Sequence, residues 1–175
     1  QNLSGQDKEY GGTMTLGVTT NTQDLDGILT DEKSFESVTE KAVEALFDSM
    51  IGLQMQTPPD YSAVKQKGKK LYELARAGVA IDIAPKEIVI RELKMTAWNL
   101  PDIYFRMACS KGTYVRTICD ETGKRLGCGA VLSSLSRTRV GKFFLRDAVT
   151  DRSLKEMTLA RIQKDLLENL SRVQR

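Results

Sequence analysis

Alternating apolar and polar positions mark three long strands in the chain. Residues 13–20 and 103–109 alternate apolar side chains with more polar ones, a pattern typical of half-buried strands. Residues 87–98 are equally rich in β-forming side chains, but the alternation slips between Ile90 and Leu93, which predicts a β-bulge. Shorter strands are expected over residues 79–83 and 137–145, and a short element over residues 131–135.

Apolar residues at helical spacing predict helices between these strands. The first follows Ser37-Val-Thr-Glu40, whose S-x-x-E spacing is that of a capping box, and Gly52 ends it. The last is an amphipathic helix over residues 158–174. Two further helices are expected over residues 71–75 and 114–122.

The order of these elements predicts an α+β fold. Helices and strands alternate irregularly, and several of the strands look antiparallel, so we expect a mixed, mostly antiparallel sheet flanked by helices. A length of 175 residues fits one domain. We assign residues 1–150 to this domain and residues 151–175 to a C-terminal helix of the same domain.

The amino-acid composition limits the kinds of catalytic and metal site that the chain can form. The chain has no histidine, which excludes histidine bases, histidine triads and histidine-ligated zinc. Three cysteines without a C-x-x-C pair favour a reducing compartment, either the cytoplasm or an organellar matrix. Asp24-x-Asp26-Gly27 begins like a calcium loop but lacks the later ligands, so no metal is expected. The net charge is +3, and no apolar run reaches the ~20 residues that span a bilayer, so no membrane association is expected.

Basic residues gather in two segments that could contact a phosphate backbone. The first holds four lysines behind a Pro-Pro connection, and the second holds two arginines that would project from one face of a strand. In both cases a simple solvated surface remains the alternative interpretation. The candidate RNA-binding residues are Lys65, Lys67, Lys69, Lys70, Arg137 and Arg139.

A third segment, residues 109–116, ends a strand and begins a helix. Tyr114 and Arg116 lie near the helix N-terminus, where unsatisfied backbone N–H groups favour anions. Arg116 can hold a carboxylate or phosphate in a bidentate fork, and a tyrosine can stack on a base. The alternative is a core tyrosine with Arg116 paired to Asp120, four residues further on.

Taken together, several pieces of the sequence resemble the TruB-type tRNA pseudouridine synthases. They occur in the family's order over residues 8–146, and their joint occurrence is specific. The pieces are Lys8-Glu-Tyr10, Thr22-x-Asp24-x-Asp26-Gly27, Pro59-x-Tyr-Ser-Ala-x-Lys65, Gly68-Lys-Lys-Leu-Tyr72, Cys109-Ser-Lys-Gly-Thr-Tyr-x-Arg116 and Leu126-Gly-Cys-Gly-Ala130, followed by Leu135 and Arg137.

The resemblance implies an enzyme that isomerises a uridine in the T-arm of tRNA without cofactor or metal. The target base is expected to flip out of the RNA stack into a pocket. By family match, Tyr10 packs on the flipped base and Arg116 pairs with a catalytic aspartate. Tyr114 and Leu135 match residues that contact the target nucleotide, and Lys65 matches a basic residue near the pocket.

One feature of the family is missing from these residues. The family's nucleophilic aspartate lies in a Leu-Asp-Pro-like loop upstream of the Tyr10 position, and no Leu-Asp-Pro occurs here. We therefore expect an incomplete catalytic domain, inactive alone, with the upstream segment supplied by a companion chain or lying outside these 175 residues. We expect no small RNA-binding PUA domain in these residues. The alternative is a non-catalytic RNA-binding or ribonucleoprotein assembly subunit, and a missing segment ought to expose an apolar face.

Overall fold

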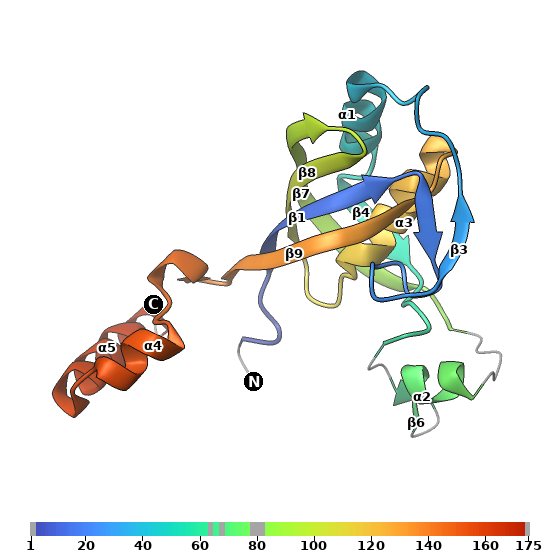
Figure 1. Cartoon of the computed structure of the whole chain (residues 1–175). Coiled ribbons are helices and arrows are strands. Elements are labelled where there is room, and N and C mark those ends of the chain that lie inside the picture. The colour runs from blue at the N-terminus through green and yellow to red at the C-terminus, as the bar shows by residue number, and fades with distance from the viewer. Residues whose placement is uncertain (1–2, 63–64, 67–68, 78–82, 174–175) are drawn as a thin grey trace.

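One antiparallel sheet organises the chain. The structure, a computed structural model, describes residues 3–62, 65–66, 69–77 and 83–173. Its six-stranded sheet has the order β10-β9-β1-β8-β7-β4, and every neighbouring pair of strands is antiparallel (Figure 1). The strands are β1 (Lys8–Leu16), β4 (Gly52–Gln56), β7 (Lys86–Asn99), β8 (Asp102–Cys109), β9 (Ala130–Val140) and β10 (Phe143–Phe144).

Smaller elements surround this sheet. Two-stranded pairs are formed by β2 (Val18–Thr20) with β3 (Leu29–Glu32), and by β5 (Lys65–Gln66) with β6 (Lys69–Lys70). The helices are α1 (Glu40–Ser49), α2 (Leu71–Arg76), α3 (Val115–Leu126), the short 3₁₀ turn η1 (Leu145–Asp147), α4 (Asp151–Glu156) and α5 (Leu159–Val173). In Figure 1, α4 and α5 lie apart from the sheet, beyond the end of β9.

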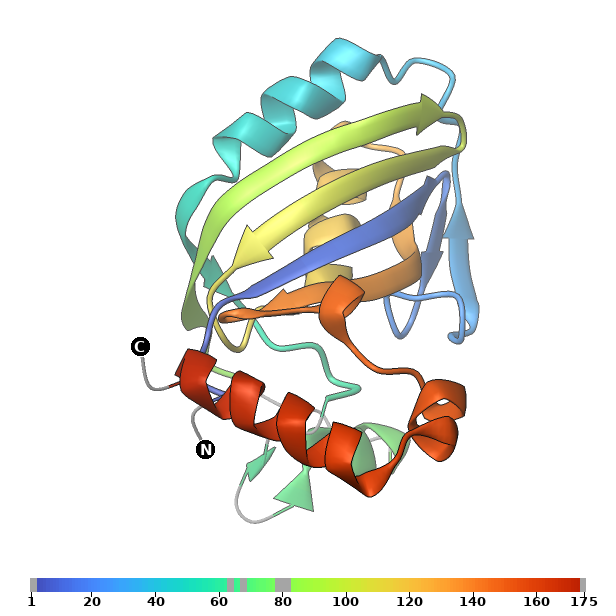
Figure 2. The same ribbon diagram turned by 90° about the vertical axis from the view of Figure 1, so that its left-hand side faces the viewer.

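The hydrophobic core lies between one face of the sheet and helices α1 and α3. The two helices contact each other, α1 packs on β7, and α3 packs on β9 (Figure 2). Alternate residues of β1 enter this core, where Met14 is fully buried and Tyr10 is 8% exposed. Phe47 from α1 meets Phe105 from β8 edge to face, with ring centroids 6.5 Å apart.

The opposite face of the sheet is mostly polar. Ion pairs join neighbouring strands there: Arg106 Nη2 lies 2.6 Å from Glu92 Oε1, and Arg139 Nε lies 3.8 Å from Glu9 Oε2. Exposed apolar side chains on this face are concentrated at the β4 edge, where Met55 is 63% exposed. Cross-strand charge pairs suit a sheet surface that faces water. The apolar face expected of an incomplete domain stays a prediction.

The structure confirms the long strands and corrects several boundaries. The bulge expected in 87–98 is present, as a register shift in β7 between Ile90 and Glu92. The strand predicted over 13–20 is divided at Gly17, whose φ of 88° is unfavourable for other residues. The helix cap is Thr39 rather than Ser37, and its side chain accepts a hydrogen bond from the backbone N–H of Ala42.

Three further differences concern β-structure. β4 was not predicted: Leu53 and Met55 alternate with glutamines, but these apolar residues are exposed and the buried residue is the polar Gln56. The short element expected over 131–135 and the strand expected over 137–145 are largely one continuous strand, β9, followed by a turn at Gly141 and the two-residue β10. Most of the strand expected over 79–83 lies outside the described residues. Among the described residues, no helix has the length and apolar character needed to cross a membrane.

Candidate active site

Arg116 is the centre of the best-defined polar site. It lies in the first turn of α3, and its side chain is only 20% exposed. Its Nη1 lies 2.9 Å from Asp24 Oδ2, and its Nη2 donates a hydrogen bond to the backbone carbonyl of Tyr61. A guanidinium held on two sides keeps its position and its charge, which is what recognition of an anion requires.

The loop after β2 places Asp24 opposite Arg116. The preceding residue, Gln23, has a φ of 67°, and its carbonyl accepts a hydrogen bond of 3.0 Å from the backbone N–H of Leu132 in β9. The Gln23 side chain bridges two residues of α3: it accepts from Thr117 Oγ1 and donates to Asp120 Oδ2. The loop is therefore attached to both β9 and α3, and Asp24 has little freedom to move away from Arg116.

The carboxylate that pairs with Arg116 is that of Asp24. The sequence suggested either an aspartate outside these residues or Asp120, but the partner in the structure is Asp24. Asp120 instead lies 2.7 Å from Lys124 Nζ. Asp24 belongs to Thr22-x-Asp24-x-Asp26-Gly27, which resembles a TruB-type motif and begins like a calcium loop. Neither interpretation predicts an ion pair with Arg116. Its pairing depends on a contact 92 residues apart in sequence, which spacing rules do not capture.

One donor of Arg116 is left over. Its Nε is buried and has no hydrogen-bond partner among the described residues, and the same is true of Ser62 Oγ. Buried side-chain donors are seldom left unsatisfied in folded proteins, so an orphaned guanidinium donor in a polar site calls for an explanation. A functional site that accepts another acidic group is one such explanation.

Tyr114 borders the same site as the N-cap residue of α3. The buried side chain of Gln56 fixes its backbone: Gln56 Oε1 accepts from the Tyr114 N–H at 2.8 Å, and Gln56 Nε2 donates to the Tyr114 carbonyl at 3.1 Å. The Arg116 guanidinium carbon is 6.0 Å from the centre of the Tyr114 ring. Tyr114 and Arg116 are therefore neighbours at the start of α3, and their roles in contacting a nucleotide and a catalytic carboxylate stay predictions.

Strand register places Tyr10 and Leu135 on the face of the sheet that α3 covers. Tyr10 pairs with Arg137, Gly12 with Leu135, and Met14 with the core residue Leu132. Directly opposed residues of antiparallel strands share a face, so these side chains line one surface. Leu135 is 45% exposed there, an unusual exposure for a leucine beside a core position.

The environment of Tyr10 keeps its phenol neutral. Burial raises the pKa of Tyr10 above its ordinary value, and the nearby Arg137 guanidinium only partly opposes this shift. The guanidinium carbon of Arg137 lies 5.6 Å from the centre of the Tyr10 ring. Tyr10 is therefore an uncharged ring that is buried in the core beside a cation, and its contact with a flipped base stays a prediction.

The two candidate arginines of β9 have different neighbours. Arg137 lies opposite Tyr10, whereas Arg139 lies opposite Glu9, and these β1 residues point to opposite faces. The prediction that both arginines project from one face is therefore wrong, because a register shift at Thr138 interrupts the alternation. Thr138 Oγ1 donates to Glu9 Oε1 at 2.8 Å, which holds the bulge.

The lysine cluster is only partly described. Lys65, Lys69 and Lys70 belong to the β5–β6 hairpin, where Lys65 pairs with Lys70, while Lys67 lies outside the described residues. The hairpin connects to the site through Tyr61, whose carbonyl binds Arg116 and whose hydroxyl lies 3.4 Å from Asn21 Nδ2. The role of these lysines in RNA binding stays a prediction.

Comparison with known families now gives these features a common context. Residues 1–115 match the model of the TruB family pseudouridylate synthase N-terminal domain, and residues 116–173 match that of the tRNA pseudouridylate synthase B C-terminal domain. The protein belongs to the TruB family of pseudouridylate synthases.

Individual relatives agree with this assignment. The chain is 42% identical to a tRNA pseudouridine synthase B of Opitutus terrae over 167 residues, which cover 95% of the chain and 69% of that protein. It is 47% identical to the enzyme of the same name from Burkholderia mallei over 150 residues, or 86% of the chain and 49% of that protein. The chain thus spans about half to two thirds of these relatives.

Solved structures share the fold at lower identity. A crystal structure of a Cbf5–Nop10–Gar1 complex contains a chain that matches with a TM-score of 0.61 and 24% identity, covering 86% of this chain and 35% of that one. An H/ACA ribonucleoprotein bound to a substrate RNA containing 2′-deoxyuridine matches with a TM-score of 0.56 and 20% identity, covering 86% of this chain and 33% of that one. These likenesses show the α+β fold expected from the sequence.

Proposed function

We propose that this chain forms most of the uridine pocket of a pseudouridine synthase that acts on the T-arm of tRNA. The observation that carries the proposal is the Arg116 site: a guanidinium fixed by Asp24 and Tyr61, with one buried donor still unpartnered. Membership of the TruB family supplies the reaction. In that reaction the C1′–N1 bond of uridine breaks and a C1′–C5 bond forms, while C5 loses a proton and N1 gains one.

In this proposal the nucleophilic carboxylate lies outside the 175 residues, either earlier in the same polypeptide or on a companion chain. Its approach to Arg116 Nε would satisfy the orphaned donor and keep the carboxylate ionised. Asp24 is a poor candidate for the nucleophile, because its Oδ2 is already bound by Arg116 and its Oδ1 accepts a hydrogen bond of 2.5 Å from Thr22. Asp24 instead orients the guanidinium.

The remaining residues have roles in substrate binding. Tyr10 packs on the flipped uracil, and Leu135 and Tyr114 line the pocket on the same side of the sheet. The lysines of the β5–β6 hairpin, Lys65 first among them, bind the RNA backbone from outside the pocket. Three buried free cysteines fit a protein of a reducing compartment.

Tritium release from T-arm RNA labelled at C5 of uridine tests this function directly. We expect no release by the 175-residue chain alone. Release should appear when the chain is joined to the upstream segment of the Opitutus terrae relative, because the pocket then has its nucleophile. RNA binding without any release by the joined protein would contradict the proposal and favour a non-catalytic RNA-binding subunit.

A further inference from the structure

Gln23 is unusual in its backbone conformation and in its hydrogen bonds. Its φ of 67° lies in the left-handed region, where no other non-glycine residue of the described chain lies. Such a conformation persists where the surrounding structure enforces it, and it is concentrated at functional sites. The N–H of Gln23 donates to the Thr20 carbonyl at 3.2 Å, its carbonyl accepts from the Leu132 N–H at 3.0 Å, and its side-chain amide is bonded to α3 at both ends. Every polar group of Gln23 is therefore bonded within the fold.

The side-chain amide of Gln23 spans one turn of α3. Its Oε1 accepts from Thr117 Oγ1 at 2.8 Å, and its Nε2 donates to Asp120 Oδ2 at 3.1 Å. Residues three and four apart are neighbours on one helix face, so Asp120 shares a face with both Thr117 and Arg116. The next residue of the loop, Asp24, binds Arg116 itself. Two consecutive loop residues therefore contact three residues at the start of α3.

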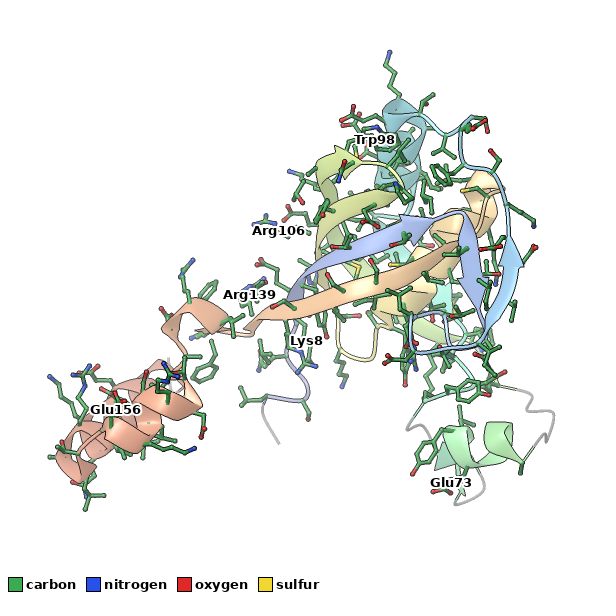
Figure 3. The ribbon with its side chains drawn as sticks, in the orientation of Figure 1. Lys8, Glu73, Trp98, Arg106, Arg139 and Glu156 are labelled. Carbon is green, nitrogen blue, oxygen red and sulfur yellow. The ribbon has the colours of Figure 1, made fainter. Side chains whose placement is uncertain are left out.

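Asp120 anchors the Gln23 amide with a buried carboxylate. It is only 6% exposed, and its Oδ2 also lies 2.7 Å from Lys124 Nζ. A buried carboxylate needs hydrogen bonds and an opposite charge to remain ionised at low cost. The arginines of the outer sheet face, Arg106 and Arg139, project away from α3 (Figure 3), so they do not supply that charge. Lys124 supplies it from the same helix, and the Gln23 amide adds a second hydrogen bond.

The charge of Asp120 fixes the direction of the Gln23 amide. An ionised carboxylate only accepts hydrogen bonds, so the NH₂ end of the amide must face Asp120 and its oxygen must face the Thr117 hydroxyl. A glutamate at this position would have the same shape but no donor, and two carboxylates would then oppose each other. The loop would be pushed away from α3. Because Asp24 follows Gln23 directly, its carboxylate would lose its place 2.9 Å from Arg116 Nη1.

We propose that Gln23 and Asp120 are positioning residues for the reaction. Their hydrogen bond holds Asp24 against Arg116, and Asp24 in turn orients the guanidinium toward the nucleophilic carboxylate. Neither Gln23 nor Asp120 contacts the substrate. The proposal rests on the proposed function, since it assumes that Arg116 pairs with that carboxylate, and it adds two residues that act on the pocket from outside it.

Exchanging the donor and the acceptor tests the proposal by tritium release in the protein joined to its upstream segment. Gln23→Glu should lower kcat roughly 100-fold, the cost of misplacing a catalytic group by about 1 Å, and should change KM less than about twofold. Adding Asp120→Asn should restore most of the rate, because the new amide donates to the new carboxylate. Gln163→Glu, the same change at an exposed position of α5, is the control and should keep the full rate. A double variant as slow as Gln23→Glu alone would overturn the proposal, as would a raised KM with kcat unchanged.

A second variant separates the side chain of Gln23 from its backbone. Gln23→Gly favours the positive φ but has no amide, so kcat should fall as it does in Gln23→Glu. Full activity of Gln23→Gly would show that only the backbone conformation matters, and the proposed role of the amide would be wrong.

The Nε–H resonance of Arg116 gives a measurement that does not depend on activity. This group is buried, so its proton should exchange slowly with water in the 175-residue chain, and its signal is assigned by its loss in Arg116→Lys. Gln23→Glu should shift the resonance and speed its exchange, and adding Asp120→Asn should reverse both changes. An unchanged resonance in Gln23→Glu would overturn the proposal. If the joined protein releases tritium but the double variant is not rescued, the positioning role is wrong and the proposed function stands. If it releases none, the proposed function falls, and a shifted resonance leaves only the structural hold on Arg116.

Discussion

Replacing Asp24 tests how the site holds Arg116. Asp24→Asn keeps the shape of the side chain but removes the charge that lies 2.9 Å from Arg116 Nη1. The two side chains are 24% and 20% exposed, so the pair is neither a surface ion pair nor fully buried. Surface pairs contribute about 0–1 kcal/mol, and breaking a buried pair costs about 3–5 kcal/mol. We therefore expect the free energy of unfolding to fall by about 1–3 kcal/mol.

A double-mutant cycle separates the pair from other effects of the substitutions. Asp24→Asn, Arg116→Met and the double variant are unfolded in urea, and the fluorescence of the single tryptophan, Trp98, is followed. We expect a coupling energy of about 1–3 kcal/mol. The exposed pair Lys155–Asp151 serves as the control and should show no measurable coupling. A coupling energy for Asp24 and Arg116 as small as that of the control would refute the view that Asp24 fixes the guanidinium.

Three other predictions concern the core around the pocket. Gly12→Ala should lower the free energy of unfolding in urea by about 1–3 kcal/mol, because the new Cβ would lie 2.6 Å from the Phe105 ring. Gly11→Ala is the control and should lower it much less, because the nearest atom to its new Cβ is 4.0 Å away. Burial raises the pKa of each of the three cysteine thiols, so a thiol reagent at pH 8 should label them far faster in urea than in the folded protein; equal rates would contradict this burial. Because the folded protein also holds the Tyr10 proton more tightly, its raised pKa stabilises the fold below pH 10, and this contribution should be lost as pH rises further. Unfolding measured from pH 9 to 12 should show a smaller loss in Tyr10→Phe than in the unaltered protein.

The sequence predicted the helices and strands better than it predicted the contacts in the candidate active site. Alternation in 103–109 and helical spacing around Phe47 depend on neighbours within one element, and the structure confirms both. Even the slip near Ile90 was visible, because a bulge changes the local pattern. β4 was not predicted, because its apolar residues Leu53 and Met55 are exposed and its buried residue is the polar Gln56.

The contacts that define the site come from segments far apart in the chain. Tyr114 and Arg116 could be placed together because two residues at a helix start are necessarily close. The pairing of Arg116 with Asp24 could not be predicted, since it depends on the loop at Gln23 being attached to β9. The separation of Arg137 from Arg139 follows from a bulge that local sequence does not mark.

The most direct test of the account compares two arginines of α3 by tritium release in the protein joined to its upstream segment. Arg116→Lys keeps the positive charge but removes the planar guanidinium, which binds Asp24 and has one donor left for a second carboxylate. We therefore expect the rate of tritium release to fall by at least roughly 100-fold, about 3 kcal/mol. Arg125→Lys, on the same helix, should retain the full rate. Equal rates for the two variants would contradict the claim that Arg116 organises the reaction.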